Sequence, residues 1–145
     1  MKTLVIITSL AVAFLFIRAT VIKAKSVEEG KGIIFFEGTW QEALDLAKKE
    51  NKLIFLDAYA SWCGPCKLLK SKVFPTTKAG EFFNSNFINI KIDMEKGEGP
   101  ALAEKYGVTA YPSLFFINHA GQVKKHAVGY HNVNQLIEFA QHALK

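Results

Sequence analysis

Cysteine is scarce in this chain of 145 residues: there are two, Cys63 and Cys66, separated by Gly64 and Pro65. A pair this close closes a very short loop, so it restricts the unfolded chain little and would stabilise the protein only weakly as a structural bridge. Half of the residues are hydrophobic, which is enough to build a core without cross-links. The cysteine pair is therefore available for chemistry.

A strong charge of either sign is also missing. The formal net charge of +5 depends on Lys2, Arg18 and Lys23, which lie in a distinct N-terminal segment. Without these three, the 18 basic residues become 15, against 13 acidic residues. We find no basic stripe interleaved with aromatic residues, and the sequence therefore argues against a nucleic-acid partner.

Residues 1–24 resemble an export signal, with a basic Lys2 followed by an uncharged run from Thr3 to Ile17. As a helix this run is about 22 Å long, shorter than the bilayer core of about 30 Å. A longer span would have to hold Arg18 at the membrane interface. Because the cleavage site at Ala24 is poor, both a cleaved signal peptide and an N-terminal membrane anchor remain open. In either case we expect an exported protein, located in the periplasm.

Residues 25–32 are charged and flanked by glycine, which indicates a linker, and residues 33–145 then form one domain. Apolar runs indicate strands, and apolar residues at helical spacing indicate helices. Their order predicts an α/β fold, with a mixed central sheet and helices on both faces. The expected strands are residues 33–37, 53–58, 87–93, 113–118 and 122–130, and the expected helices begin near residues 39, 66, 77, 100 and 132.

The two cysteines stand where a predicted strand gives way to a predicted helix. Residues 53–58 form the strand and the helix continues from Cys66 to Val73, so Cys63 falls at the helix N-terminus. Free N–H groups and the positive end of the helix dipole stabilise a thiolate there. Cys66, three residues further on, is close enough to form a disulfide with Cys63. This arrangement predicts a redox-active dithiol.

The segment Trp62-Cys63-Gly64-Pro65-Cys66-Lys67 resembles the active-site motif of the thioredoxin family. Asp57, six residues before Cys63, and the sequence Tyr111-Pro112-Ser113 resemble the family in order and spacing. The resemblance covers residues 33–145 and implies the thioredoxin fold and dithiol–disulfide exchange. The break Phe74-Pro75-Thr76-Thr77 is more similar to secreted and periplasmic members than to cytosolic thioredoxin.

The resemblance implies a role for each of three residues. Cys63, expected to be exposed, attacks a substrate disulfide, and Cys66, expected to be covered, resolves the mixed disulfide. Asp57 lies beneath Cys66 and accepts its proton, with a pKa raised by burial. One departure concerns this aspartate: the family often has a lysine four residues before the position of Asp93, where this chain has Asn89.

Five other residues are expected to contact substrate or shape the active site. Gly64 keeps the cysteine accessible, and Pro65 begins the helix without losing a hydrogen bond. Trp62 and Tyr111 border the site. Pro112 corresponds to the family's cis-proline, which exposes backbone groups to an extended substrate segment.

Two different uses of the cysteines are a structural bridge and half of a metal site. Four-coordinate zinc needs two further ligands, and none of the four histidines has a ligand spacing near the cysteines. Asp93, Glu95 and Glu98 lack the order of an EF-hand calcium loop. We therefore expect no metal and no cofactor, with the histidines on the surface.

Together these features predict a thiol–disulfide oxidoreductase that reduces protein disulfides outside the cytoplasm. Its partners are disulfide-containing proteins and a membrane or soluble thiol protein that supplies electrons. A disulfide isomerase or oxidase would use the same cysteines and would differ in redox potential. The same fold also suits a non-enzymatic binding module or a thiol metal carrier.

Overall fold

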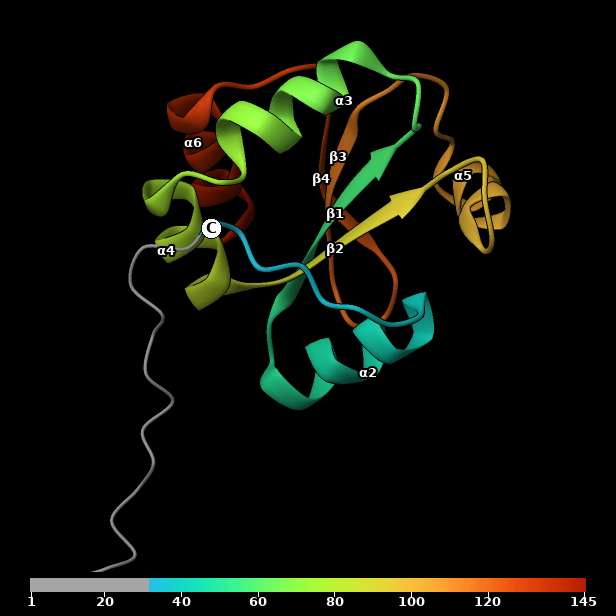
Figure 1. Ribbon diagram of the computed structural model, residues 1–145. Coiled ribbons are helices and arrows are strands. Elements are labelled where there is room, and N and C mark those ends of the chain that lie inside the picture. Colours follow the sequence, from blue (N-terminus) through green and yellow to red (C-terminus); the bar gives the residue numbers. More distant parts are fainter. Residues whose placement is uncertain (1–31) are drawn as a thin grey trace, which may run out of the picture.

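A four-stranded sheet forms the centre of the structure, a computed structural model that describes residues 32–145 (Figure 1). The strand order is β2-β1-β3-β4. β1 pairs in parallel with β2 and antiparallel with β3, and β3 pairs antiparallel with β4. The predicted mixed sheet is confirmed, with strands β1 (Leu53–Tyr59), β2 (Phe87–Asp93), β3 (Ser113–Ile117) and β4 (Val123–Val128).

The N-terminal predictions concern residues that the structure does not describe. The export segment at residues 1–24 and all but the last residue of the 25–32 linker lie outside the described residues. Within residues 32–145, no helix is both long enough and apolar enough to cross a membrane.

Helices cover both faces of the sheet, as predicted (Figure 1). Along β1 the side chains alternate, so Ile54 and Leu56 face one layer and Phe55 faces the other. Because Asp57 is two residues after Phe55, it points toward the layer that contains the active-site helix. The first layer holds α2 (Trp40–Glu50) and α5 (Gly99–Tyr106); the second holds α3 (Gly64–Leu68), the π-helix η2 (Leu69–Val73), α4 (Thr77–Asn86) and α6 (Val133–Ala143).

A cluster of phenylalanines anchors β1 beneath the second layer. The ring centroids of Phe55 and Phe83 are 4.7 Å apart, and those of Phe87 and Phe116 are 4.8 Å apart. All four side chains are buried, and each such burial stabilises the fold by roughly 1.5–3 kcal/mol. The strand that carries Asp57 is therefore held firmly two residues before the carboxyl group.

Helix ends follow the sequence closely. Thr39 forms a capping box with Glu42, and Asn132 forms one with Gln135. Asn51 ends α2 in the left-handed conformation, with φ of 51°, and its N–H bonds to the last turn. These side chains satisfy terminal backbone groups locally, which is why the sequence alone located these boundaries.

The predicted first strand, residues 33–37, is wrong: the segment is extended but forms no strand. Its backbone N–H groups donate to three different elements rather than to one ladder. Ile33 N bonds to Phe74 O at 2.7 Å and Phe36 N bonds to Asn89 O at 2.7 Å. Ile34 N bonds to the Asn84 side chain at 2.9 Å. The segment therefore runs beside β2 without joining the sheet.

The active-site helix also differs from the continuous helix expected up to Val73. After α3 it widens into the π-helix η2, and Phe74 N donates to Leu69 O at 2.9 Å. An i→i+5 bond of this kind closes a π turn. The side chains of Leu69, Val73 and Phe74, which lie in and just after this turn, are buried in the core.

Candidate active site

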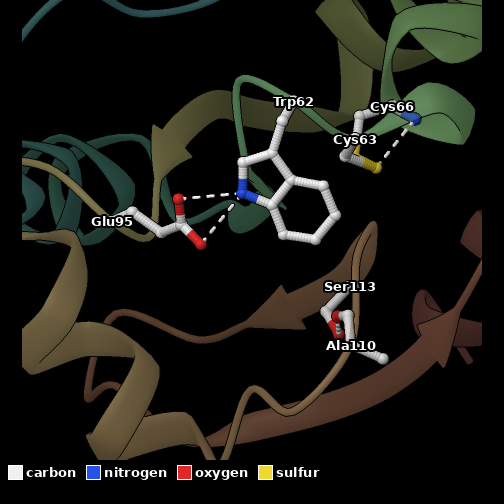
Figure 2. Close-up of a disulfide and its surroundings, with 6 residues drawn as sticks. All are labelled: Trp62, Cys63, Cys66, Glu95, Ala110 and Ser113. Carbon is white, nitrogen blue, oxygen red and sulfur yellow. Dashed lines mark hydrogen bonds between the residues drawn. A yellow bond between two sulfur atoms is a disulfide. The ribbon is translucent and has the colours of Figure 1, made fainter.

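Cys63 and Cys66 form a disulfide at the start of α3, with their Cα atoms 5.3 Å apart (Figure 2). Cys63 is the residue that caps the helix, and its Sγ accepts a hydrogen bond from Cys66 N at 3.1 Å. The predicted location of Cys63 at a helix N-terminus is confirmed. Pro65 stands in the first turn, and a Cβ added to Gly64 would meet open space. The sulfur therefore lies at the helix N-terminus beside the Cys66 N–H, where negative charge is favoured.

The expectation that Cys63 is exposed is wrong for the disulfide state. Cys63 is 2% exposed and Cys66 is 6% exposed. Both cysteines pack with buried Ala60, and the half-buried rings of Tyr59 and Tyr111 cover this cluster. The covering rings come from β1 and from the loop before β3, which is why local sequence around the motif did not reveal them.

Trp62 forms the outer border of the site and is 65% exposed. Its ring meets Tyr111 edge to face, with centroids 5.8 Å apart. Its Nε1 donates to both carboxylate oxygens of Glu95, at 2.9 and 3.1 Å (Figure 2). We call Trp62, Tyr111 and Glu95 the rim. The contact between Glu95 and Trp62 was not predicted, because the two residues are 33 positions apart.

The peptide bond between Tyr111 and Pro112 is cis, as the resemblance implied. Two hydrogen bonds hold the loop around Pro112. Ser113 Oγ donates to Ala110 O at 2.8 Å, and Gly129 N donates to Pro112 O at 2.8 Å. Ala110 and Ser113, on either side of this bond, lie in the surroundings of the disulfide (Figure 2).

Asp57, near the end of β1, is 4% exposed, and its Oδ1 has no hydrogen-bond partner. Burial raises the pKa of this carboxyl to about 7, because the charged form loses its hydration. Lys91 opposes this rise in pKa and is the direct partner of Asp57 across the β1–β2 pairing. The predicted rise in pKa is confirmed. A carboxyl with a pKa near 7 exchanges protons readily at neutral pH.

Asp57 and Cys66 line the same hollow, which has a volume of about 520 Å³. Cys63 does not line it, so the two sulfurs face different surroundings. The structure thus brings Cys63, Trp62 and Tyr111 together on one side of the disulfide. It brings Cys66, Asp57 and Lys91 together on the other.

Within residues 32–145, histidine, cysteine, aspartate and glutamate form no group of three or more that could hold a metal ion.

The thioredoxin family model matches residues 34–142, most of the part of the chain that carries this geometry. The chain belongs to the thioredoxin family. The predicted thioredoxin fold is therefore confirmed, and the protein is a thiol–disulfide oxidoreductase with a redox-active Cys63–Cys66 pair.

Individual members of the family and solved structures are also similar to this chain. Thioredoxin H4 of Arabidopsis thaliana is 37% identical over 105 residues, covering 72% of this chain and 83% of the relative. A Bacteroides thetaiotaomicron protein proposed to be a disulphide-isomerase is 44% identical, with a TM-score of 0.71 and coverage of 80% of this chain and 96% of that one. The C-terminal domain of Neisseria meningitidis DsbD, in its oxidised form, is 26% identical, with a TM-score of 0.61 and coverage of 74% and 97%.

Compared with the family pattern, this chain has Asn89 where a lysine is frequent. The side chain of Asn89 is buried, and its Nδ2 donates to Ile34 O at 3.2 Å. Lys91, two residues later and on the same side of β2, lies opposite Asp57 instead. Lys91 was not among the predicted site residues, although the period of two along a strand places it on the same side as Asn89.

We expect Lys91→Met to raise the pKa of Asp57 above about 7, because the positive charge that favours the carboxylate is removed. A ¹³C NMR titration of the Asp57 carboxyl carbon measures this change. Lys125→Met, which removes an exposed charge on β4, is the matched control and leaves the pKa in place. An unchanged pKa in Lys91→Met would show that Lys91 does not act on Asp57.

Proposed function

We propose that this protein reduces disulfides of other proteins outside the cytoplasm. The observation that carries the proposal is the position of Cys63 Sγ, which caps α3 and accepts the Cys66 N–H at 3.1 Å. A thiolate formed there is stabilised by the same N–H and by the helix dipole, so Cys63 is the nucleophile.

The first step breaks the substrate disulfide. The Cys63 thiolate attacks one substrate sulfur, and the other leaves as a thiolate that takes a proton from solvent. In the second step the Cys66 thiol gives its proton to the Asp57 carboxylate, directly or through water. Cys66 then attacks Cys63 Sγ, and the remaining substrate sulfur leaves. Two electrons pass to the substrate, and the Cys63–Cys66 disulfide forms.

Substrates contact the Cys63 side of the disulfide. Trp62 offers an exposed aromatic surface, and open space above Gly64 leaves room for a substrate chain beside Pro65. The backbone next to Pro112 pairs with an extended substrate segment, and Tyr111 borders it. Side chains of the protein contact the substrate only at the rim, and the other contacts are made by backbone groups. This arrangement suits an enzyme that acts on many partners.

The direction of electron flow is tested by the redox potential. The uncharged Gly64-Pro65 pair adds no further stabilisation of the thiolate, so the dithiol remains reducing. We expect a potential near that of thioredoxin, about −270 mV. Equilibration of the purified protein in glutathione buffers, with free thiols counted by mass, measures it, and Cys63→Ser provides a control without the transition. A value at or above about −180 mV, that of protein disulfide isomerase, would overturn the reductase proposal.

A redox potential at or above about −180 mV would favour a second candidate function, that of a disulfide isomerase. This candidate is supported by the 44% identity to the Bacteroides thetaiotaomicron protein that is proposed to be one. Refolding of a protein with scrambled disulfides separates the two, because an isomerase restores the native pairing without net reduction. Regeneration by a membrane or soluble thiol protein belongs to the reductase proposal, and the likeness to a DsbD domain supports a disulfide-related redox partner.

Export is the remaining part of the proposal and rests on the apolar run Thr3–Ile17. We expect residues 1–24 to carry a fused reporter enzyme, one that is active only outside the cytoplasm, across the membrane. Replacing Leu10 with arginine interrupts the apolar run and provides the control that stays inside. The mass of the mature protein decides between cleavage after Ala24 and an N-terminal anchor. A wild-type fusion with no more reporter activity than the Leu10→Arg control would refute export.

A further inference from the structure

The hollow behind the disulfide has the size of a small-molecule site. Its volume of about 520 Å³ lies within the roughly 300–1,000 Å³ of typical ligand pockets. Cys66 and Asp57 line it, whereas Trp62, Tyr111 and Pro112 do not. The hollow is therefore separate from the surface proposed for protein substrates.

The walls of the hollow combine apolar and cationic side chains. Apolar residues of residues 33–37 and of the turn after η2 form one wall: Ile33, Phe35, Phe74 and Pro75. The basic residues of the hollow are Lys67, Lys70 and Lys91, and within residues 32–145 none of these lysines forms an ion pair. Lys91 Nζ lies 5.2 Å from the ring centroid of Phe35, which places positive charge directly beside an apolar surface.

Asp57 is the single acidic residue among those that line the hollow. Its side chain is more than nine-tenths buried and presents an oxygen without a hydrogen-bond partner. Three lysines against one carboxyl give the hollow a positive charge, which attracts anions. The Oδ1 atom of Asp57 is itself enclosed, so the lysines and the apolar wall are the groups that a bound molecule would contact.

We propose that this hollow binds a small carboxylate with an apolar body. The carboxylate lies among Lys67, Lys70 and Lys91, and the body packs against Phe35 and Phe74. A bound molecule displaces water from Asp57, so it slows the loss of the Cys66 proton and the resolution of the mixed disulfide. This last consequence rests on the proposed function, whereas the binding itself does not.

The binding test uses the full, oxidised chain without any protein substrate. Octanoate is the probe, octylammonium has the same body with the opposite charge, and inorganic phosphate has charge without a body. Calorimetry is expected to show octanoate binding at least about tenfold more tightly than either control. NMR shift changes are expected at the amides of Cys66, Lys67 and Lys70. Equal binding of the three probes, or shift changes confined to β4, would overturn the proposal.

Measurements on Lys70→Met distinguish specific binding in the hollow from general attraction of an anion to a basic protein. We expect octanoate to bind this variant about tenfold more weakly, because one of three lysines that face the carboxylate is lost. Lys125→Met removes the same charge on exposed β4, outside the hollow, and is expected to leave the affinity unchanged. An equal loss of octanoate affinity in both variants would overturn the proposed site.

A turnover assay tests whether a molecule bound in the hollow slows the resolution of the mixed disulfide. Octanoate is expected to slow disulfide reduction by the wild-type protein, with a midpoint that equals its dissociation constant, and to require about tenfold more in Lys70→Met. Binding without slowing would overturn the coupling to Asp57. Failure of the reductase proposal is recognised separately by the redox potential, which the binding experiment does not involve.

Discussion

Replacing Cys66 with alanine leaves substrate proteins covalently attached to Cys63. Attack by the Cys63 thiolate proceeds, but no second thiol is present to resolve the mixed disulfide. We expect turnover to fall by roughly 10³-fold or more, the order seen when one member of a catalytic unit is lost. Adducts appear on non-reducing gels and disappear when a reductant is added.

Cys63→Ala is the matched variant and is expected to trap nothing, because the nucleophile itself is gone. Both variants lose the disulfide, so a difference between them reports the roles of the sulfurs rather than the loss of the cross-link. Comparable adducts in the two variants would show that the assignment of attacking and resolving cysteine is mistaken.

We expect Asp57→Asn to slow turnover by about 10²-fold near neutral pH, because the proposed acceptor of the Cys66 proton is lost. The wild-type resolving step accelerates as pH rises through about 7, where the carboxyl ionises. The variant instead depends on ionisation of the thiol, whose reference pKa is about 8.5. Single-turnover kinetics from about pH 6 to about pH 9, a range that spans both pKa values, measure the rate of the resolving step for the two proteins. If the rate of the resolving step depends on pH in the same way in both proteins, Asp57 does not accept the Cys66 proton.

The same substitution changes stability in a pH-dependent way. The pKa of Asp57 is about 7 in the folded protein and 3.8 when unperturbed, so the native state holds its proton longer than the unfolded state. Wild-type stability therefore falls as pH rises from about 4 to about 7 and stays lowered above it, by up to roughly 4 kcal/mol. Asp57→Asn removes this loss.

Urea unfolding of the two proteins in acid and at alkaline pH tests the expectation. The stabilisation by Asp57→Asn should be larger at the alkaline pH, whereas Asp45→Asn, an exposed change on α2, is the control and should show no such difference. A stabilisation of equal size at both values of pH would mean that the pKa of Asp57 is not raised by burial.

The elements of this fold that were predictable are those whose signals are local. Thr39 and Asn132 indicate helix starts because each bonds backbone groups three residues away. The apolar run in β1 indicates a strand covered on both faces, as the structure has it. In both cases the residues that decide the structure are neighbours in the sequence.

The features that were not predictable depend on distant residues. Residues 33–37 lack strand pairing because their hydrogen-bond partners are Phe74, Asn84 and Asn89, at least 41 positions further along. The burial of Cys63 depends on Tyr111, and the orientation of Trp62 depends on Glu95. Neither contact has a signature around the cysteine motif, so only the folded chain reveals them.

The alternation of side chains along β1 and the turn at Cys63 have a consequence for protein engineering. The surface proposed to meet partner proteins, at Trp62 and Tyr111, is separated by the disulfide from Asp57, the proposed proton acceptor, and from Lys91. Partner choice is therefore a modular property: a library that varies Trp62, Tyr111 and Glu95 explores new specificities while the proton chemistry stays intact. The protein is a scaffold whose recognition and catalysis can be evolved in separate rounds.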